Sequence, residues 1–250
     1  MQLHLIEVKE VLNNCMKLHH FIGPLEVAGD EVRVVDTKVI HHIKDVLKIV
    51  VGEKIILADG EGAEFLVRVG TLTDDVVIGH ILEQAQDWRP RTPVTLYAAI
   101  LKRDSFEFLV EKTTELGVSA IAPFISERTV KLGLNEERLK RISTEAAEQS
   151  EQSIVPELRE SVPLSSALAQ AKDSQIYFFA QDGKELHEID VPPAGRPIAL
   201  FIGPEGGFTP TEVAEARAAG AVVVSLGKTM LRAETAATVT VFWATQILGK

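Results

Sequence analysis

The hydrophobic positions of this chain change their spacing about a third of the way along. Before residue 84, short runs rich in β-branched residues alternate with turn residues and predict strands over Glu53–Asp59, Ala63–Val69 and Val76–Gln84. Ahead of them, Thr37–Ile49 carries apolar residues at helical spacing and predicts a helix. Roughly 70 residues with this pattern suit a small β-barrel with one helix.

After residue 93 the pattern becomes an alternation of helical stretches and continuous apolar runs. Continuous apolar runs are typical of strands buried on both faces. Their alternation with helices predicts an α/β domain with a parallel sheet between two helical layers. The predicted strands are Val94–Leu101, Ile121–Ile125, Ile176–Ala180, Ile198–Ile202 and Val222–Leu226.

Two helices of this second part have clear signals. The apolar positions between Phe106 and Leu116 share one helical face, and Gly117 follows as a C-cap. The last predicted helix, Ala233–Leu248, is apolar or small on nearly every side and has one charged residue, Glu234. We expect a helix of this composition to be buried in the core or in a subunit interface.

The two parts are joined by a polar segment, Gln84–Pro93, which contains two prolines and predicts a linker. We therefore place one domain at residues 17–86 and a second at residues 92–250. Residues 1–16 precede both, and we expect an N-terminal extension or leader there.

Composition narrows the class of protein. The chain has 250 residues, of which 46% are hydrophobic, enough for one large core or two modest ones. Cys15 is the one cysteine, so an internal disulfide and a cysteine-rich zinc site are excluded. The longest uncharged run near the C-terminus, Thr235–Gly249, is too short to span a bilayer. Glu7 and Lys9 interrupt the apolar stretch at the N-terminus, which argues against a secretory signal peptide. We expect a cytoplasmic protein without a membrane segment.

The formal net charge of −10 argues against nucleic acid as a partner, because phosphate binding favours a basic surface. If RNA is the partner, it must meet a local basic patch on an acidic body. Any interpretation that involves RNA must therefore be reconciled with the acidic net charge.

The strongest candidate for chemistry is a glycine-rich segment after the strand Ile198–Ile202. The loop Gly203–Gly207 is followed by a helix start with Thr209 as N-cap and Glu212 three residues on, which predicts a capping box. Such a loop lies beyond the carboxyl end of a strand, where α/β sheets bind ligands. The alternative is a tight turn without a ligand. The loop lacks the spacing of nucleotide fingerprints, so ATP and NAD are disfavoured.

Arg232 is the second candidate. It stands in a short loop before the last helix, where it could hold an anion or a carbonyl oxygen. An ion pair with Glu234 or Glu205 is an equally good interpretation. Arg128, after the strand Ile121–Ile125, could likewise bind a phosphate or lie on the surface.

A metal site is disfavoured. The pairs His19–His20 and His41–His42 are adjacent in sequence, so their side chains diverge on a strand or a helix. Neither a cysteine nor a cluster of carboxylates completes a ligand set beside them. We expect no bound metal.

Several short motifs occur in order along the chain. They are Glu115–Val118, Ile121–Thr129, Glu148–Ser150, Val155–Pro156, Ile202–Gly207, Leu226–Gly227 and Leu231–Ala236, and upstream His41–Ile43, Val46–Leu47, Gly52 and Asp59–Gly60. Together they closely resemble the 16S rRNA (uracil-N3) methyltransferases, the RsmE family of the SPOUT class. The resemblance runs from about Met16, which looks like the ordinary start in that family, to the C-terminus.

The resemblance implies a fold, a cofactor and a substrate. The N-terminal domain would be a PUA-like RNA-binding β-barrel and the C-terminal domain an α/β SPOUT domain with a trefoil knot that acts as a homodimer. The enzyme would methylate N3 of the uridine at position 1498 of 16S rRNA in the small ribosomal subunit, with S-adenosylmethionine (SAM) as methyl donor.

The resemblance also implies site residues. The cofactor would lie against Phe179, Ala180, Ile202, Gly203, Pro204, Glu205, Gly206, Gly207, Leu226, Gly227, Met230, Leu231 and Arg232. The RNA would lie against His19, His20, His41, Lys48, Lys102, Arg103 and Arg128.

The substrate suggests the catalytic roles. Uridine N3 carries a proton and becomes a nucleophile as that proton leaves, so the enzyme must stabilise a developing anion. Arg232 is the expected partner of O2 or O4 of the base. Glu234 is a possible base, although a role as the acid that opens the last helix suits it better.

The chain departs from the family pattern at three basic positions. Glu151 and Gln152 stand where relatives usually carry a basic pair, Ser105 replaces a basic residue, and Lys48 replaces an arginine. These changes weaken the expected RNA surface but not the cofactor site. Two alternatives stay open: a SPOUT enzyme for another rRNA site, and a non-catalytic rRNA-binding assembly factor.

Overall fold

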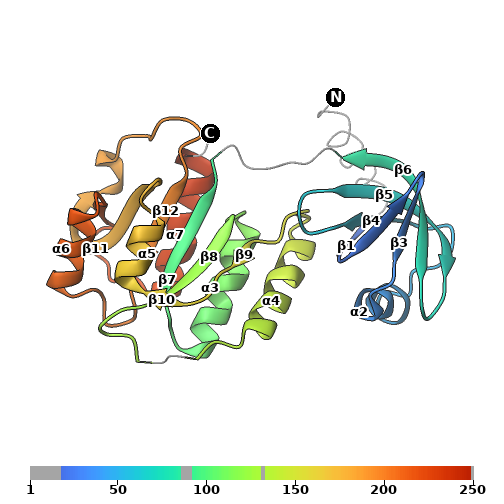
Figure 1. Ribbon diagram of the computed structural model, residues 1–250, viewed down its shortest axis with the longest axis horizontal. Helices are drawn as coiled ribbons and strands as arrows, with labels where there is room; N and C mark the ends of the chain where they lie inside the picture. Colours follow the sequence, from blue (N-terminus) through green and yellow to red (C-terminus); the bar gives the residue numbers. More distant parts are fainter. Residues whose placement is uncertain (1–17, 86–91, 131–132, 249–250) are drawn as a thin grey trace. The chain divides into compact units, whose positions relative to one another are not determined.

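The computed structural model describes residues 18–85, 92–130 and 133–248 (Figure 1). The predicted extension at residues 1–16 and most of the predicted linker lie outside the described residues. The chain divides into two compact units. The first unit holds residues 18–85 together with 147–155, and the second holds the described residues of 92–146 and 156–248.

The first unit is built on a six-stranded sheet (Figure 1). The pair β1–β4 is parallel and the other neighbouring pairs are antiparallel. The predicted strands of this part are present as β4, β5 and β6. In spatial order the strands are β1 (His19–Ile22), β4 (Lys54–Ala58), β5 (Glu64–Leu72), β6 (Val77–Ala85), β3 (Glu31–Val34) and β2 (Leu25–Ala28).

The helix predicted over Thr37–Ile49 is present in two forms. It begins as α2 (Thr37–His41) and continues as a π-helical turn, η1 (His42–Val46). The Asp36 side chain caps it by accepting hydrogen bonds from two backbone N–H groups, the shorter at 2.8 Å. Ile40 and Ile43 are buried in the core of this unit, as the helical spacing predicts.

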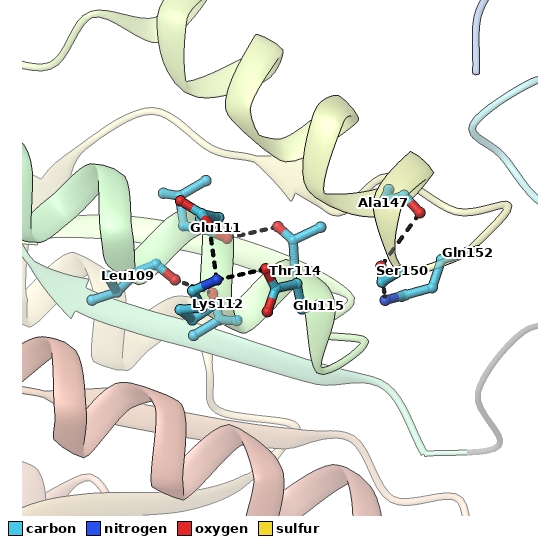
Figure 2. A network of polar contacts seen from close by, with 10 residues as sticks. Leu109, Glu111, Lys112, Thr114, Glu115, Ala147, Ser150 and Gln152 are labelled. Atoms are coloured by element: carbon cyan, nitrogen blue, oxygen red, sulfur yellow. Dashed lines mark hydrogen bonds and ion pairs between the residues drawn. The ribbon is translucent and has the colours of Figure 1, made fainter. Parts of the chain in front are cut away.

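Residues 147–155 group with the first unit although they follow the helix α4 (Glu136–Gln149) of the second part of the chain. The Ile22 N–H donates to Glu148 Oε1 at 2.7 Å, and the Val155 N–H donates to the Gly60 carbonyl at 2.9 Å. Ser150 donates from its hydroxyl to the Ala147 carbonyl and accepts from the Gln152 amide (Figure 2). The hydrophobic pattern did not predict this grouping.

The second unit contains the predicted parallel sheet. Its strand order is β10-β8-β7-β12-β11-β13, with β9 also paired to β8. All of these pairs are parallel, and β12 lies between β7 and β11. The strands are β7 (Val94–Ala99), β8 (Ala120–Ile125), β9 (Glu157–Leu158), β10 (Val162–Pro163), β11 (Gln175–Glu185), β12 (Ile198–Ile202) and β13 (Val222–Ser225).

Helices cover both faces of this sheet, which confirms the predicted layers (Figure 1). Alternate residues of β7 point to opposite sides: Leu96 and Ala98 into one apolar cluster, Tyr97 and Ala99 into the other. The first cluster includes residues of α3 (Arg103–Glu115) and α7 (Ala233–Trp243), and the second includes residues of α5 (Leu164–Gln170) and α6 (Pro210–Ala218).

Polar contacts fix α3 and join it to α4. Lys112 Nζ donates to Glu111 and Glu115 of its own helix at 2.7 and 2.8 Å (Figure 2). The buried hydroxyls of Thr114 and Ser143 lie 3.1 Å apart, a hydrogen bond between α3 and α4. The predicted end of α3 is also observed, because Gly117 follows it with a positive φ of 77°.

The last helix is only half buried within one copy of the chain. Ala237, Val241 and Trp243 of α7 pack in the core, and the helix continues as a π-helical turn, η3 (Ala244–Leu248). Its other face carries exposed large apolar side chains, among them Phe242 and Ile247. None of the described helices is long and apolar enough to cross a membrane.

Candidate active site at the carboxyl edge of the sheet

The loops that follow the strands of the second unit meet at one edge. Because the strands are parallel, their carboxyl ends lie on the same side of the sheet. Two of these loops carry the residues singled out by sequence. We call residues 203–209, after β12, the glycine loop, and residues 226–232, after β13, the Arg232 loop.

The glycine loop has the geometry that its sequence predicts. The Gly207 N–H donates to the Pro204 carbonyl at 2.8 Å, and Gly207 has a φ of +68°, which glycine adopts without strain. The predicted capping box is present: Glu212 Oε2 accepts from the Thr209 N–H at 2.8 Å, and the Thr209 hydroxyl accepts from the Glu212 N–H at 3.3 Å.

The turn after β8 holds the glycine loop at two points. Arg128 Nη1 donates to the Gly206 carbonyl at 2.7 Å. The backbone N–H of Glu127 donates to Glu212 Oε1 at 2.9 Å, so the buried Glu212 carboxylate serves both the helix cap and this turn. Sequence reasoning did not identify Glu212 as a link between two loops.

The segment after β7 adds a third point. The backbone N–H of Lys102 donates to Glu205 Oε1 at 3.2 Å. Glu205 is therefore engaged by the main chain before α3. The glycine loop is thus tied to the ends of β7 and β8 as well as to its own strand.

The Arg232 loop is held more lightly. It opens at Gly227, whose φ is +96° and whose N–H donates to the Ser225 hydroxyl at 3.2 Å. Arg232 precedes α7 with its side chain 87% exposed, and its Nη1 lies 4.0 Å from Glu234 Oε1. Of the two ion pairs considered from sequence, the structure has the one with Glu234, at the outer limit of distance.

A bulge in β11 forms the remaining side of the candidate site. The pairing of β11 with β13 shifts between Phe179 and Lys184, so that residues 180–183 leave the ladder. Gln181 from this bulge donates to Met230 Sδ of the Arg232 loop at 3.4 Å. Gly183 lies so close to β13 that a Cβ there would be 2.4 Å from the Val224 carbonyl carbon.

Comparison with known proteins identifies the chain. A family model described as an RNA methyltransferase domain matches residues 89–245, and one described as an RNA methyltransferase PUA domain matches residues 35–81. The chain is similar to the ribosomal RNA small subunit methyltransferase E of Synechocystis, with 33% identity covering 81% of this chain and 69% of that protein. The same enzyme of Bacillus subtilis is 30% identical, covering 79% and 83%. The chain belongs to the ribosomal RNA small subunit methyltransferase E family.

A solved structure of this family agrees with the fold. The enzyme of Neisseria gonorrhoeae, bound to S-adenosyl methionine, superposes with a TM-score of 0.82 at 29% identity and covers 91% of this chain and 97% of that one. The predicted fold class is thereby confirmed: a PUA-like domain precedes a methyltransferase domain with a parallel sheet.

The predicted cofactor residues of this methyltransferase E family member share the carboxyl edge of three neighbouring strands. Phe179 ends the first paired part of β11, where it meets Trp243 edge-on at 6.3 Å between ring centres, and Ala180 is the first residue of the bulge. Ile202 and Pro204 are buried, whereas residues 205–207 and 227–230 are exposed. Exposed glycine backbones at one carboxyl edge of the sheet suit close contact with a small ligand.

The predicted RNA residues of the first unit differ in accessibility. The His20 side chain is 2% exposed and lies 3.9 Å from the buried Glu64, so it forms part of the interior of this unit. His19 is half-buried. His41 is exposed and pairs with Asp45 at 2.8 Å. Lys48 is exposed with a φ of 54°, a left-handed backbone that is uncommon for a lysine.

The predicted RNA residues of the second unit are engaged in the fold. Arg103 Nε donates to Glu107 at 2.8 Å, and Arg138 of α4 donates to both oxygens of the same carboxylate. The hydrogen bonds from Arg138, which has the larger effect, and from Arg103 lower the pKa of Glu107 from 4.5 to about 2. Arg128 binds the glycine loop, as described, and Lys102 binds it through the main chain. In the described part of the chain, no three histidine, cysteine or acidic side chains gather as metal ligands.

Proposed function

We propose that this protein transfers a methyl group from SAM to N3 of a uridine in 16S rRNA of the small ribosomal subunit. The observation that carries the proposal is the pairing of a firmly held glycine loop with an exposed arginine at the same carboxyl edge of the sheet, where β11 lies between their two strands. Family membership supports it, since the relatives are named small subunit rRNA methyltransferases and one is solved with SAM bound. The protein would act in the cytoplasm, where its substrate, the small ribosomal subunit, is found.

The cofactor would be held by main-chain groups. The glycine loop would supply backbone groups from residues 203–207, among which Pro204 has a carbonyl but no N–H. The Arg232 loop would supply the backbone groups of residues 226–231, and Phe179 and Ala180 would form an apolar side. When bound, SAM supplies an electrophilic methyl group on a sulfonium. The bulge side chain Gln181, which contacts Met230, is a further candidate for this lining.

Arg232 would act on the base. Its guanidinium is exposed and held by Glu234 only at 4.0 Å, so it is available to a uracil oxygen. A cation beside O2 or O4 stabilises the negative charge that develops on the base as N3 loses its proton. Glu234, whose side chain is 14% exposed, would have a supporting role beside the arginine.

The activity is tested on ribosomal subunits. Small subunits from a strain lacking this modification are incubated with purified protein and SAM, and the digested nucleosides are compared with 3-methyluridine by mass spectrometry. A new 3-methyluridine peak is the expected result. A methyl group on another atom would move the site within the same enzyme class. SAM binding without methylation would contradict the proposed reaction. The absence of both SAM binding and methylation would also contradict it and would favour a non-catalytic rRNA-binding role.

We further propose that the enzyme is a homodimer. The helices α3 and α7 pack together, and both present exposed large apolar side chains: Phe108 on α3, and Val239 and Phe242 on α7. Apolar groups gathered on one pair of helices are typical of an interface between subunits. Light scattering during gel filtration tests it, with twice the chain's 27.3 kDa expected. Phe242→Asp should shift the mass to that of a monomer.

The trefoil knot implied by the family resemblance is also a proposal. It is supported by the strand order, in which β12 follows β11 in the sequence but lies between β7 and β11 in the sheet. A knotted chain pulled from both ends stays shorter than its full contour length. Extension to the full length would contradict the knot.

A further inference from the structure

Arg128 stands at an unusual place for a residue expected to bind RNA. Its guanidinium donates to the main-chain carbonyl of Gly206, the middle residue of the glycine loop. Its methylene groups cover the same residue, since a Cβ built on Gly206 would lie 3.4 to 3.9 Å from them. The side chain therefore lies against the middle of the loop along its own length.

The peptide group between Gly206 and Gly207 is fixed at both ends as a result. Its carbonyl accepts from Arg128 at 2.7 Å, and its N–H donates to the Pro204 carbonyl at 2.8 Å. Two successive glycines would otherwise make this the most conformationally free segment of the loop. Fixing this one peptide plane fixes the direction of the neighbouring amides.

The arginine is itself anchored. The Ser126 N–H donates to the Thr129 hydroxyl at 3.0 Å, which closes the turn that carries Arg128. The Glu127 N–H in the same turn binds Glu212 at the far end of the glycine loop. The turn after β8 is thus hydrogen-bonded to the middle of the glycine loop at Gly206 and to Glu212 in the helix that follows the loop.

We propose that Arg128 is a positioning residue that orders the glycine loop for the cofactor. The inference rests on the proposed function, because the cofactor is the SAM assigned there. Ordering a loop before the ligand arrives removes an entropic cost from binding. Arg128 therefore acts on the affinity for SAM, and the RNA is bound by other residues.

The test compares two arginines of equal charge. Arg128→Met removes the hydrogen bond and keeps most of the apolar cover. Arg217→Met removes an exposed arginine of α6 outside the loop. Calorimetry with SAM should show about fivefold weaker binding for Arg128→Met and no change for Arg217→Met. Binding of a 16S rRNA fragment should weaken equally little in both variants.

Kinetics separate positioning from catalysis and from simple loss of structure. For Arg128→Met the KM for SAM should rise about fivefold, while kcat at saturating SAM stays within about twofold of the wild type. Arg128→Lys, which keeps a donor, should recover part of the SAM affinity. Thermal melting of each variant shows whether the fold is intact, and the lysine variant serves if the methionine variant does not fold.

Three results would overturn the inference. SAM affinity that stays unchanged in Arg128→Met, with RNA affinity falling well below that of Arg217→Met, would make Arg128 an RNA contact. A fall in kcat without a change in SAM affinity would make it a catalytic residue. A wild-type protein that binds no SAM would overturn the proposed function, and this inference with it.

Discussion

The glycine loop and the Arg232 loop lie at the same carboxyl edge of the sheet but are held very differently. The glycine loop is bonded through Gly206, Glu205 and Glu212 to segments that follow two other strands. In the described part of the chain, the side-chain hydrogen bonds between the Arg232 loop and other elements are one from Gln181 to the Met230 sulfur and one from the Gly227 N–H to Ser225 of the preceding strand. The difference matches the two tasks that the proposed reaction sets.

A loop that binds a small cofactor gains from being ordered in advance, because ordering it on binding would cost free energy. An arginine that must meet a base presented by a large RNA needs room to adjust. A loosely held arginine also keeps its donors available, whereas Arg128 has already committed one to the fold. Order on one side of the site and freedom on the other thus follow from the two substrates.

The sharpest way to break this comparison is to remove Arg232. Arg232→Ala should lower kcat about 100-fold, because one electrostatic contact to a developing anion is commonly worth about 3 kcal/mol. SAM affinity should stay within about twofold, since the glycine loop keeps all of its contacts. Methyl transfer to small subunits and calorimetry with SAM provide the two measurements.

Lys228→Ala is the matched control, as it removes another exposed cation from the same loop. We expect its kcat to remain near that of the wild type. If Arg232→Ala reduced SAM affinity as much as kcat, Arg232 would be a structural part of the cofactor site, and the contrast between the two loops would fail.

The second change tests the bulge that contacts the Arg232 loop. In Gly183→Ala the new methyl group would meet the backbone of Val224 at 2.4 to 2.6 Å, and backbone atoms of a paired strand cannot move aside cheaply. We expect a loss of about 2 kcal/mol in the free energy of unfolding, measured by urea denaturation. Gly133→Ala is the control, because a Cβ there meets nothing within 4 Å. Equal stability of the two variants would refute the close approach.

A smaller effect is expected at the buried end of the glycine loop. Glu212→Gln keeps the side chain's shape but replaces one of the two acceptor oxygens with an NH₂ group, which faces a backbone donor. The unfolding free energy should fall by about 1 kcal/mol, and SAM should bind more weakly. Glu215→Gln, on the exposed side of the same helix, should change neither. Unchanged SAM affinity in Glu212→Gln would separate the cap from the cofactor site.

The sequence predicted the parts of this architecture that depend on local pattern. The apolar runs marked the strands β7, β8, β12 and β13, and the spacing from Thr209 to Glu212 predicted a capping box that the structure confirms. In each case a short run of neighbouring residues determines the element. The pattern of those residues alone is therefore enough to predict it.

What the sequence did not predict depends on contacts between distant residues. The hydrogen bond from Arg128 to Gly206 spans 78 positions, and that from Glu127 to Glu212 spans 85. Nothing near Arg128 distinguishes an arginine that binds a loop from one that binds phosphate. The π-helical turn after α2 and the bulge of β11 also escape prediction, because both interrupt a regular pattern that the residues otherwise continue.

The smallest effect concerns Arg103, one of the predicted RNA residues. The hydrogen bonds that Arg138 and, to a smaller extent, Arg103 donate to Glu107 lower the pKa of that carboxylate from 4.5 to about 2. A carboxylate whose pKa is lower in the folded state stabilises the protein above its ordinary pKa, and this stabilisation is lost as the pH falls from 4.5 towards 2. Glu107→Gln should therefore melt below the wild type at pH 7, and the difference should shrink across that window. A difference that stayed constant down to about pH 2.5 would show that the ion pairs are not its cause. Arg103 would then be free to face the RNA, and the contrast between committed and available arginines would rest on Arg128 and Arg232 alone.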